Sequence, residues 1–156
     1  MPSKMLDSYV QDIGLLLTEE LWDEAEQYAA GLPHIAIALS SADLKSTATA
    51  YRTWCSEWVQ PGQGDATYDA WYAVSMRDPV RFVEGKPTAL LQALSLGRRL
   101  RANPSPPPRP RPSSGRGAVI SQMSTLLIAA FQVWHNTRGR ADPIVELNLA
   151  KLGALR

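Results

Sequence analysis

The sequence is poor in cysteine and histidine, the residues that most metal sites and disulfide-bonded scaffolds require. It contains one cysteine, Cys55, so no disulfide can form within the chain, and a cytoplasmic location is expected. The first residues include no apolar stretch, so no secretory signal is expected either. The only histidines, His34 and His135, lie far apart and lack metal-ligand spacing. We therefore expect no metal and no cofactor, and each histidine is interpreted as a surface or core-edge residue.

Motifs for nucleotide binding and catalysis are missing as well. The chain has no phosphate-binding glycine loop and no dinucleotide fingerprint. A nucleophile pair of Cys55 with either histidine is formally possible. Cys55 lies within an aromatic helical stripe, however, where a small buried hydrophobe is the simpler interpretation. The sequence favours a protein that is not an enzyme.

The alternation of period two that is typical of strands persists nowhere, whereas apolar residues recur at steps of three and four along most of the chain. The predicted fold is all-α, a single bundle of roughly seven helices with a Pro/Arg-rich crossover segment. Helix starts are predicted from N-cap and proline signals. These are Thr18 before residues 19–30, Pro33 opening 33–39, Ser41 or Asp43 before 44–58, Asp65, Asp78-Pro79 and Asp142-Pro143, while Gly31 is predicted to end the second helix.

The crossover is the stretch from Asn103 to Gly117, which contains six prolines and three arginines. Proline has no N–H and fixes its own φ, so no regular hydrogen-bond ladder continues through it. Its PxxP spacings suit an aromatic groove on a partner, or a semi-rigid spacer. The predicted organisation is a helical bundle with an acidic N-terminal part in residues 1–102, the crossover in 103–117, and helices in 118–156. About forty residues are too few for a second core, so these last helices are expected on the same bundle.

One long helix is expected over residues 118–137, after a helix over 88–101. No formal charge occurs from Gly117 to Thr137, which raises the question of a membrane span. Several polar side chains interrupt the run, among them Ser121, Gln122 and Gln132. They make membrane insertion costly, so a largely buried central helix is the preferred interpretation.

Charge is distributed unevenly along the chain. Residues 1–84 carry thirteen acidic and five basic side chains, whereas residues 85–156 carry two acidic and eleven basic ones. Such asymmetry is typical of a basic half that contacts nucleic acid or a membrane. The alternative is that the two halves attract each other within one fold, and their near-equal opposite charges favour it.

Two sets of residues are candidates for binding a partner. The first is aromatic, and tryptophan and tyrosine dominate the hot spots of protein interfaces. It forms either a contact surface or a packing seam between two helices, and consists of Trp54, Trp58, Tyr68, Trp71 and Tyr72. The second set is a basic strip. It either binds phosphates or forms ion pairs with the acidic helix of this chain or with a partner. It consists of Arg98, Arg99, Arg101, Arg109 and Arg111, with Arg116 beyond them.

Scattered motifs along residues 28–153 form a recognisable skeleton. It comprises Leu32-Pro33-His34, then Trp54-Cys55-x-x-Trp58-Val59-x-Pro61, then Ala118-Val119 with residues 126–130, then Asp142-Pro143 and Leu152-Gly153. The skeleton resembles a small all-helical bacterial family of unknown function, some members of which are encoded near secretion-system genes. The middle of this chain is shorter, and polar residues stand where more tryptophan is expected. The resemblance implies a bacterial accessory or interaction protein and transfers no catalytic residue.

Together these patterns predict a non-enzymatic helical domain that binds another protein, as an adaptor, chaperone or immunity-type inhibitor. A homodimer that pairs acidic with basic surfaces is included in this hypothesis. The alternative function is nucleic-acid binding through the strip Arg98–Arg116.

Overall fold

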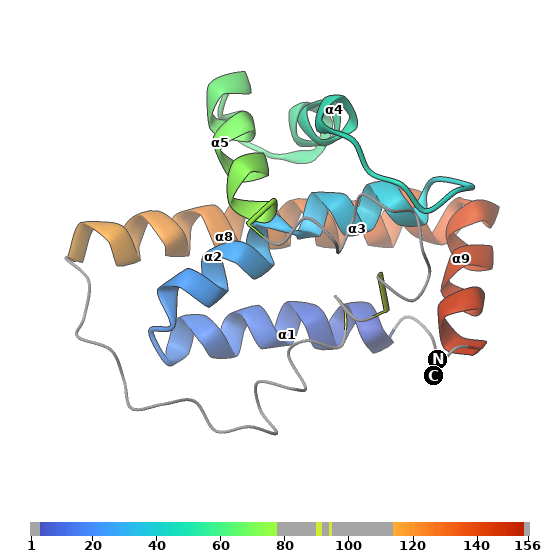
Figure 1. Ribbon diagram of the computed structural model, residues 1–156, viewed down its shortest axis with the longest axis horizontal. Helices are drawn as coiled ribbons and strands as arrows, with labels where there is room; N and C mark the ends of the chain where they lie inside the picture. Colours follow the sequence, from blue (N-terminus) through green and yellow to red (C-terminus); the bar gives the residue numbers. More distant parts are fainter. Residues whose placement is uncertain (1–3, 78–89, 92–93, 95–113, 155–156) are drawn as a thin grey trace.

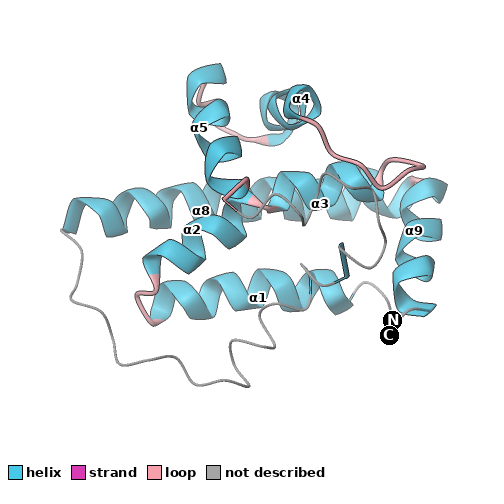
Figure 2. Ribbon diagram, viewed as in Figure 1, coloured by secondary structure: helices cyan, strands magenta, loops and turns pink. Residues whose placement is uncertain are grey.

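The chain folds into packed helices, as predicted. A computed structural model describes residues 4–77, 90, 91, 94 and 114–154, and no strand occurs among them. Figure 2 shows that the described part consists of helices and the loops that connect them. The helices are α1 (Lys4–Thr18), α2 (Trp22–Ala30), α3 (Leu32–Leu39), α4 (Ala48–Trp58), α5 (Asp65–Ser75), α8 (Ser114–Trp134), the π-helical turn η1 (His135–Gly139) and α9 (Pro143–Ala154).

The longest helix, α8, runs along the back of the molecule in the view of Figure 1. Helices α2 and α3 lie in front of α8 in this view. Helix α1 runs below them, and α4 and α5 lie above them. Helix α9 closes one end of the bundle and contacts α3. Helix α8 therefore contacts each of the first four helices.

One cluster of buried apolar side chains joins these elements. Helix α1 contributes Ile13, α3 contributes Ile35, α8 contributes Leu127 and Trp134, and α9 contributes Val145. Since both carboxy-terminal helices share this cluster with α1–α5, the described helices are held by one hydrophobic core.

Helix α8 is buried along one face only, so the expectation of a largely buried helix is wrong for its outer side. Phe131 lies in the core, whereas Val119 is 65% exposed and Val133 is 53% exposed. By length and composition, the stretch Gly115–Gly139 could cross a membrane, but almost half of its most apolar part is buried against the other helices.

The predicted start of α2 at Thr18 is wrong. Thr18 is the last residue of α1, where its Oγ1 donates to the carbonyl oxygen of Gly14 at 3.0 Å. Glu20 then adopts a φ of 58°, which interrupts the helix, and α2 begins at Trp22. A local hydrogen bond back into the preceding helix has replaced the N-cap bond.

Helix α4 also begins later than predicted. Leu44 has a φ of 58°, in the left-handed region that an α-helix cannot include, so neither Ser41 nor Asp43 caps a helix. The N-cap is Thr47, whose Oγ1 accepts a hydrogen bond from the backbone N–H of Ala50 at 3.1 Å.

Gly31 ends α2 as predicted, but with a right-handed φ of −76°, so α2 leads into α3 without the left-handed turn that a terminal glycine usually makes. Gly64 has a φ of 90° and occupies the N-cap position of α5, where Asp65 was predicted. Pro33 lies in the first turn of α3, as predicted.

The Asp142-Pro143 start is confirmed, because Pro143 opens α9 and Asp142 Oδ1 accepts from the N–H of Ile144 at 2.9 Å. Asp78-Pro79 and residues 103–113 of the crossover lie outside the described residues, as does most of the predicted helix 88–101. Residues 114–117 were assigned to the crossover, but they form the first turn of α8.

Candidate functional site

The five aromatic candidates lie on two neighbouring helices, with Trp54 and Trp58 on α4 and the other three on α5. Trp54, Tyr68 and Trp71 are buried, whereas Trp58 and Tyr72 are half-buried. Ring centroids lie 6.5 Å apart for the two α4 tryptophans and 5.5 Å apart for Tyr68 and Trp71. Of the two alternatives, this burial favours a packing seam between the two helices over an exposed contact surface.

Polar contacts hold this seam in place. The Tyr68 hydroxyl oxygen accepts a hydrogen bond from the backbone N–H of Gln63 at 2.9 Å, which ties α5 to the loop before it. Arg52 of α4 donates from two nitrogens to the carboxylate of Asp69 on α5, at 3.0 Å and 2.6 Å. Both partners are about half exposed, so this pair orients the helices more than it stabilises them.

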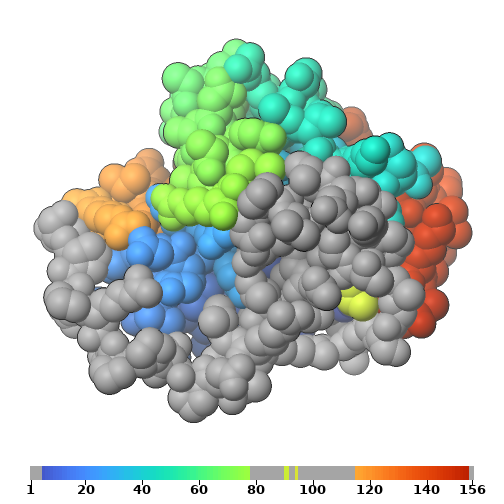
Figure 3. Space-filling view, in the orientation of Figure 1, coloured from blue at the N-terminus to red at the C-terminus, as the bar shows by residue number. Residues whose placement is uncertain are grey.

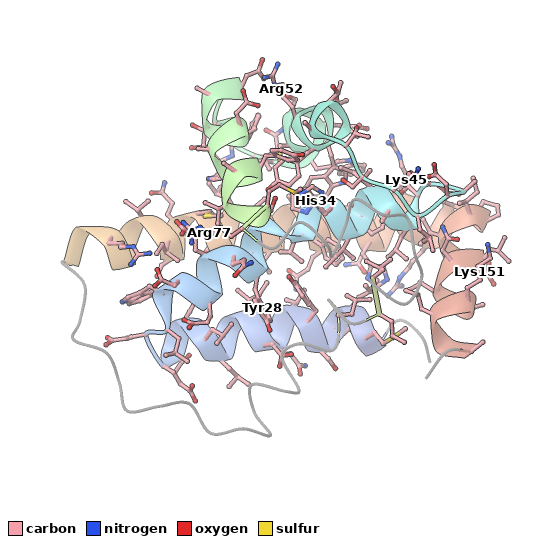
Figure 4. All side chains as sticks on the ribbon, viewed as in Figure 1. Tyr28, His34, Lys45, Arg52, Arg77 and Lys151 are labelled. Atoms are coloured by element: carbon pink, nitrogen blue, oxygen red, sulfur yellow. The ribbon has the colours of Figure 1, made fainter. Side chains whose placement is uncertain are left out.

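His34 is fully buried in α3, where α3 meets α4 and α5 (Figure 4). Its Nδ1 lies 2.6 Å from Ser46 Oγ, and its Nε2 lies 2.8 Å from Ser75 Oγ. The rings of Tyr51 and Tyr72 pack at 4.7 Å and 5.5 Å from the imidazole, centroid to centroid. The interpretation of His34 as a surface or core-edge residue is therefore wrong.

The positions of the protons in this network follow from counting donors. The Ser75 hydroxyl donates to the carbonyl oxygen of Tyr72 at 2.6 Å, so its oxygen accepts from His34 Nε2–H. Burial lowers the pKa of His34 to about 3, so the imidazole is neutral and Nδ1 accepts from the Ser46 hydroxyl. These hydrogen bonds link Ser46, His34, Ser75 and the carbonyl group of Tyr72, and we call the four groups the His34 network.

The three side chains of the His34 network are buried. The network joins α3, the connection before α4 and the end of α5. A sequence signal existed, because His34 is the one hydrogen-bonding side chain within the otherwise apolar helix Leu32–Leu39.

Cys55 is fully buried, which confirms its interpretation as a small core residue. Burial raises the pKa of its thiol to about 12, so the reactive thiolate is scarce at neutral pH. Within the described residues, no group of three His, Cys, Asp or Glu side chains is placed to hold a metal ion.

Ion pairs connect the acidic and the basic halves of the chain at the start of α8. Arg116 pairs with Asp23 of α2, and its guanidinium lies 4.0 Å from a carboxylate oxygen of Glu26. Arg77 also reaches Glu26, at 3.1 Å. Arg116 is thus engaged within its own fold.

A second connection lies near the end of α8, where Arg138 of η1 pairs with Glu57 of α4 at 2.8 Å. The same guanidinium lies 5.1 Å from the centroid of the Trp58 ring, within the range of a cation–π contact. Both connections are of the kind predicted for two halves that attract each other within one fold. The other arginines of the proposed strip, Arg98, Arg99, Arg101, Arg109 and Arg111, lie outside the described residues.

Sequence reasoning missed a further surface, which we call the outer face of α8. Four of its residues, Val119, Gln122, Ala129 and Val133, are exposed, and Leu126 between them is half-buried. In the view of Figure 3 only the beginning of α8 is clearly visible, at the left. The signal lay in the uncharged run 117–137, which was interpreted as a largely buried helix.

Comparisons of this chain with protein-family models, with curated proteins and with solved structures find no match.

Proposed function

We propose that this chain is a non-enzymatic helical domain of the cytoplasm that acts by binding another protein, as an adaptor, chaperone or immunity-type accessory protein of a bacterial system. The observation that carries the proposal is the outer face of α8. It presents two exposed valines, Val119 and Val133, on a helix without a formal charge from Gly117 to Thr137.

Two physical arguments support a protein partner. Solvated helix faces in a bundle are normally charged or polar, and loss of charge marks the centre of protein interfaces. The aromatic residues Trp54 and Trp71 are buried, so they are less available to a partner than the exposed valines of α8. The resemblance to a small all-helical bacterial family of unknown function, some members of which are encoded near secretion-system genes, favours the same function.

Other functions receive less support. Cys55 and His34 are the described residues best suited to nucleophilic chemistry, and both are buried. Nucleic-acid binding through Arg98–Arg116 is weakened because Arg116 is paired with Asp23. Retention on a polyanion column that falls steeply with salt would revive that alternative.

Photo-crosslinking in the native host tests the proposal. A photoreactive phenylalanine analogue replaces Val119 or Val133, both exposed, and a matched control replaces Thr53, which is exposed on α4. We expect discrete protein adducts, including adducts of the chain with itself, from the two α8 positions and none from Thr53. If the α8 positions give no adduct while the protein is folded and expressed, the proposed function is wrong.

A further inference from the structure

We draw no further inference here: the strongest candidate, the uncharged outer face of α8 with Val119 and Val133 exposed, carries none because nothing in the structure shows what covers it.

Discussion

Asn148 of α9 donates a hydrogen bond from Nδ2 to the backbone carbonyl oxygen of Leu39 at 2.9 Å, across 109 positions of sequence. Leu39 is the last residue of α3, where carbonyl groups have no partner within the helix. The same amide nitrogen also donates to the carbonyl oxygen of Ser41, at 2.8 Å. A residue near the end of the chain therefore caps a helix near its beginning, in a site that is almost fully buried.

Asn148→Asp should destabilise the fold by about 3 kcal/mol at pH 7, because a carboxylate oxygen would then face two carbonyl oxygens in a buried site. Part of the loss should be recovered near pH 4, when the carboxyl group is protonated. Urea denaturation followed by circular dichroism measures the change, with Asn136→Asp on exposed η1 as the control. Equal stability of the two variants would contradict the capping role.

The His34 network predicts that stability falls as the solution is acidified. The unfolded state binds a proton on His34 near its ordinary pKa of 6.5, whereas the folded state does so only near 3. Between these values the unfolded state holds more protons, so the free energy of unfolding decreases as pH falls. We expect a loss of about 2 kcal/mol between pH 7 and pH 5, at about 1.4 kcal/mol per pH unit below 6.5.

Urea titrations at several pH values measure this slope. His34→Gln should remove most of it, whereas His135→Gln should keep most of it. Burial also lowers the pKa of His135, but that imidazole is half-buried rather than enclosed. An NMR titration that gives His34 an ordinary pKa would refute the assignment of a neutral imidazole.

Two glycines in the first turns of α8 should respond oppositely to alanine. A Cβ at Gly117 would lie 2.9 Å from Cζ2 and 3.2 Å from Cε2 of Trp22, against a flat and rigid ring. We expect Gly117→Ala to cost about 1 to 2 kcal/mol of unfolding free energy. Gly115 has open space around its Cβ position, so Gly115→Ala should be neutral or stabilise by up to about 1 kcal/mol. A stabilising Gly117→Ala would show that Trp22 moves freely.

Cys55 should resist alkylation in the folded protein. Its burial and the raised pKa of its thiol, about 12, keep the thiolate scarce and enclosed at pH 8. Mass spectrometry should find no carbamidomethyl adduct after an hour with iodoacetamide, and complete modification in 6 M guanidinium. Rapid alkylation of the folded protein would instead support a nucleophilic Cys55.

Cutting the chain between residues 103 and 113 should not separate its two parts. Helix α8 places Leu127 and Phe131 in the core shared with the first five helices, and Asn148 is bonded to the end of α3. We therefore expect the fragments produced by an introduced protease site to co-elute on size exclusion. Their separation without denaturant would contradict a single core.

Local patterns predicted the helices well where neighbours in sequence carry the signal. Pro33 marked the first turn of α3, and Asp142-Pro143 located the start of α9, because an N-cap bond involves residues two positions apart. Predictions failed where another short-range bond competed, as when Thr18 bonded back to Gly14. They also failed at Leu44, whose left-handed backbone accompanies a buried side chain.

The candidate site was harder to predict because exposure depends on residues that are distant in sequence. The spacing of Trp54, Trp58 and Trp71 is the same for a seam as for an exposed surface, and only the packing of α4 on α5 decides between them. His34 likewise gave no indication that Ser46 and Ser75 would supply its partners.

The sequence by itself determined the all-α class, the absence of an internal disulfide and the opposing charges of the two halves, since these depend on composition and local spacing. The tertiary structure decided which polar groups are buried and satisfied, and which face of α8 is covered. The physical reason is that α8 has apolar residues on both sides, and the four helices that contact it, α1 to α4, cover only one of them. The outer face is left with Val119 and Val133 exposed.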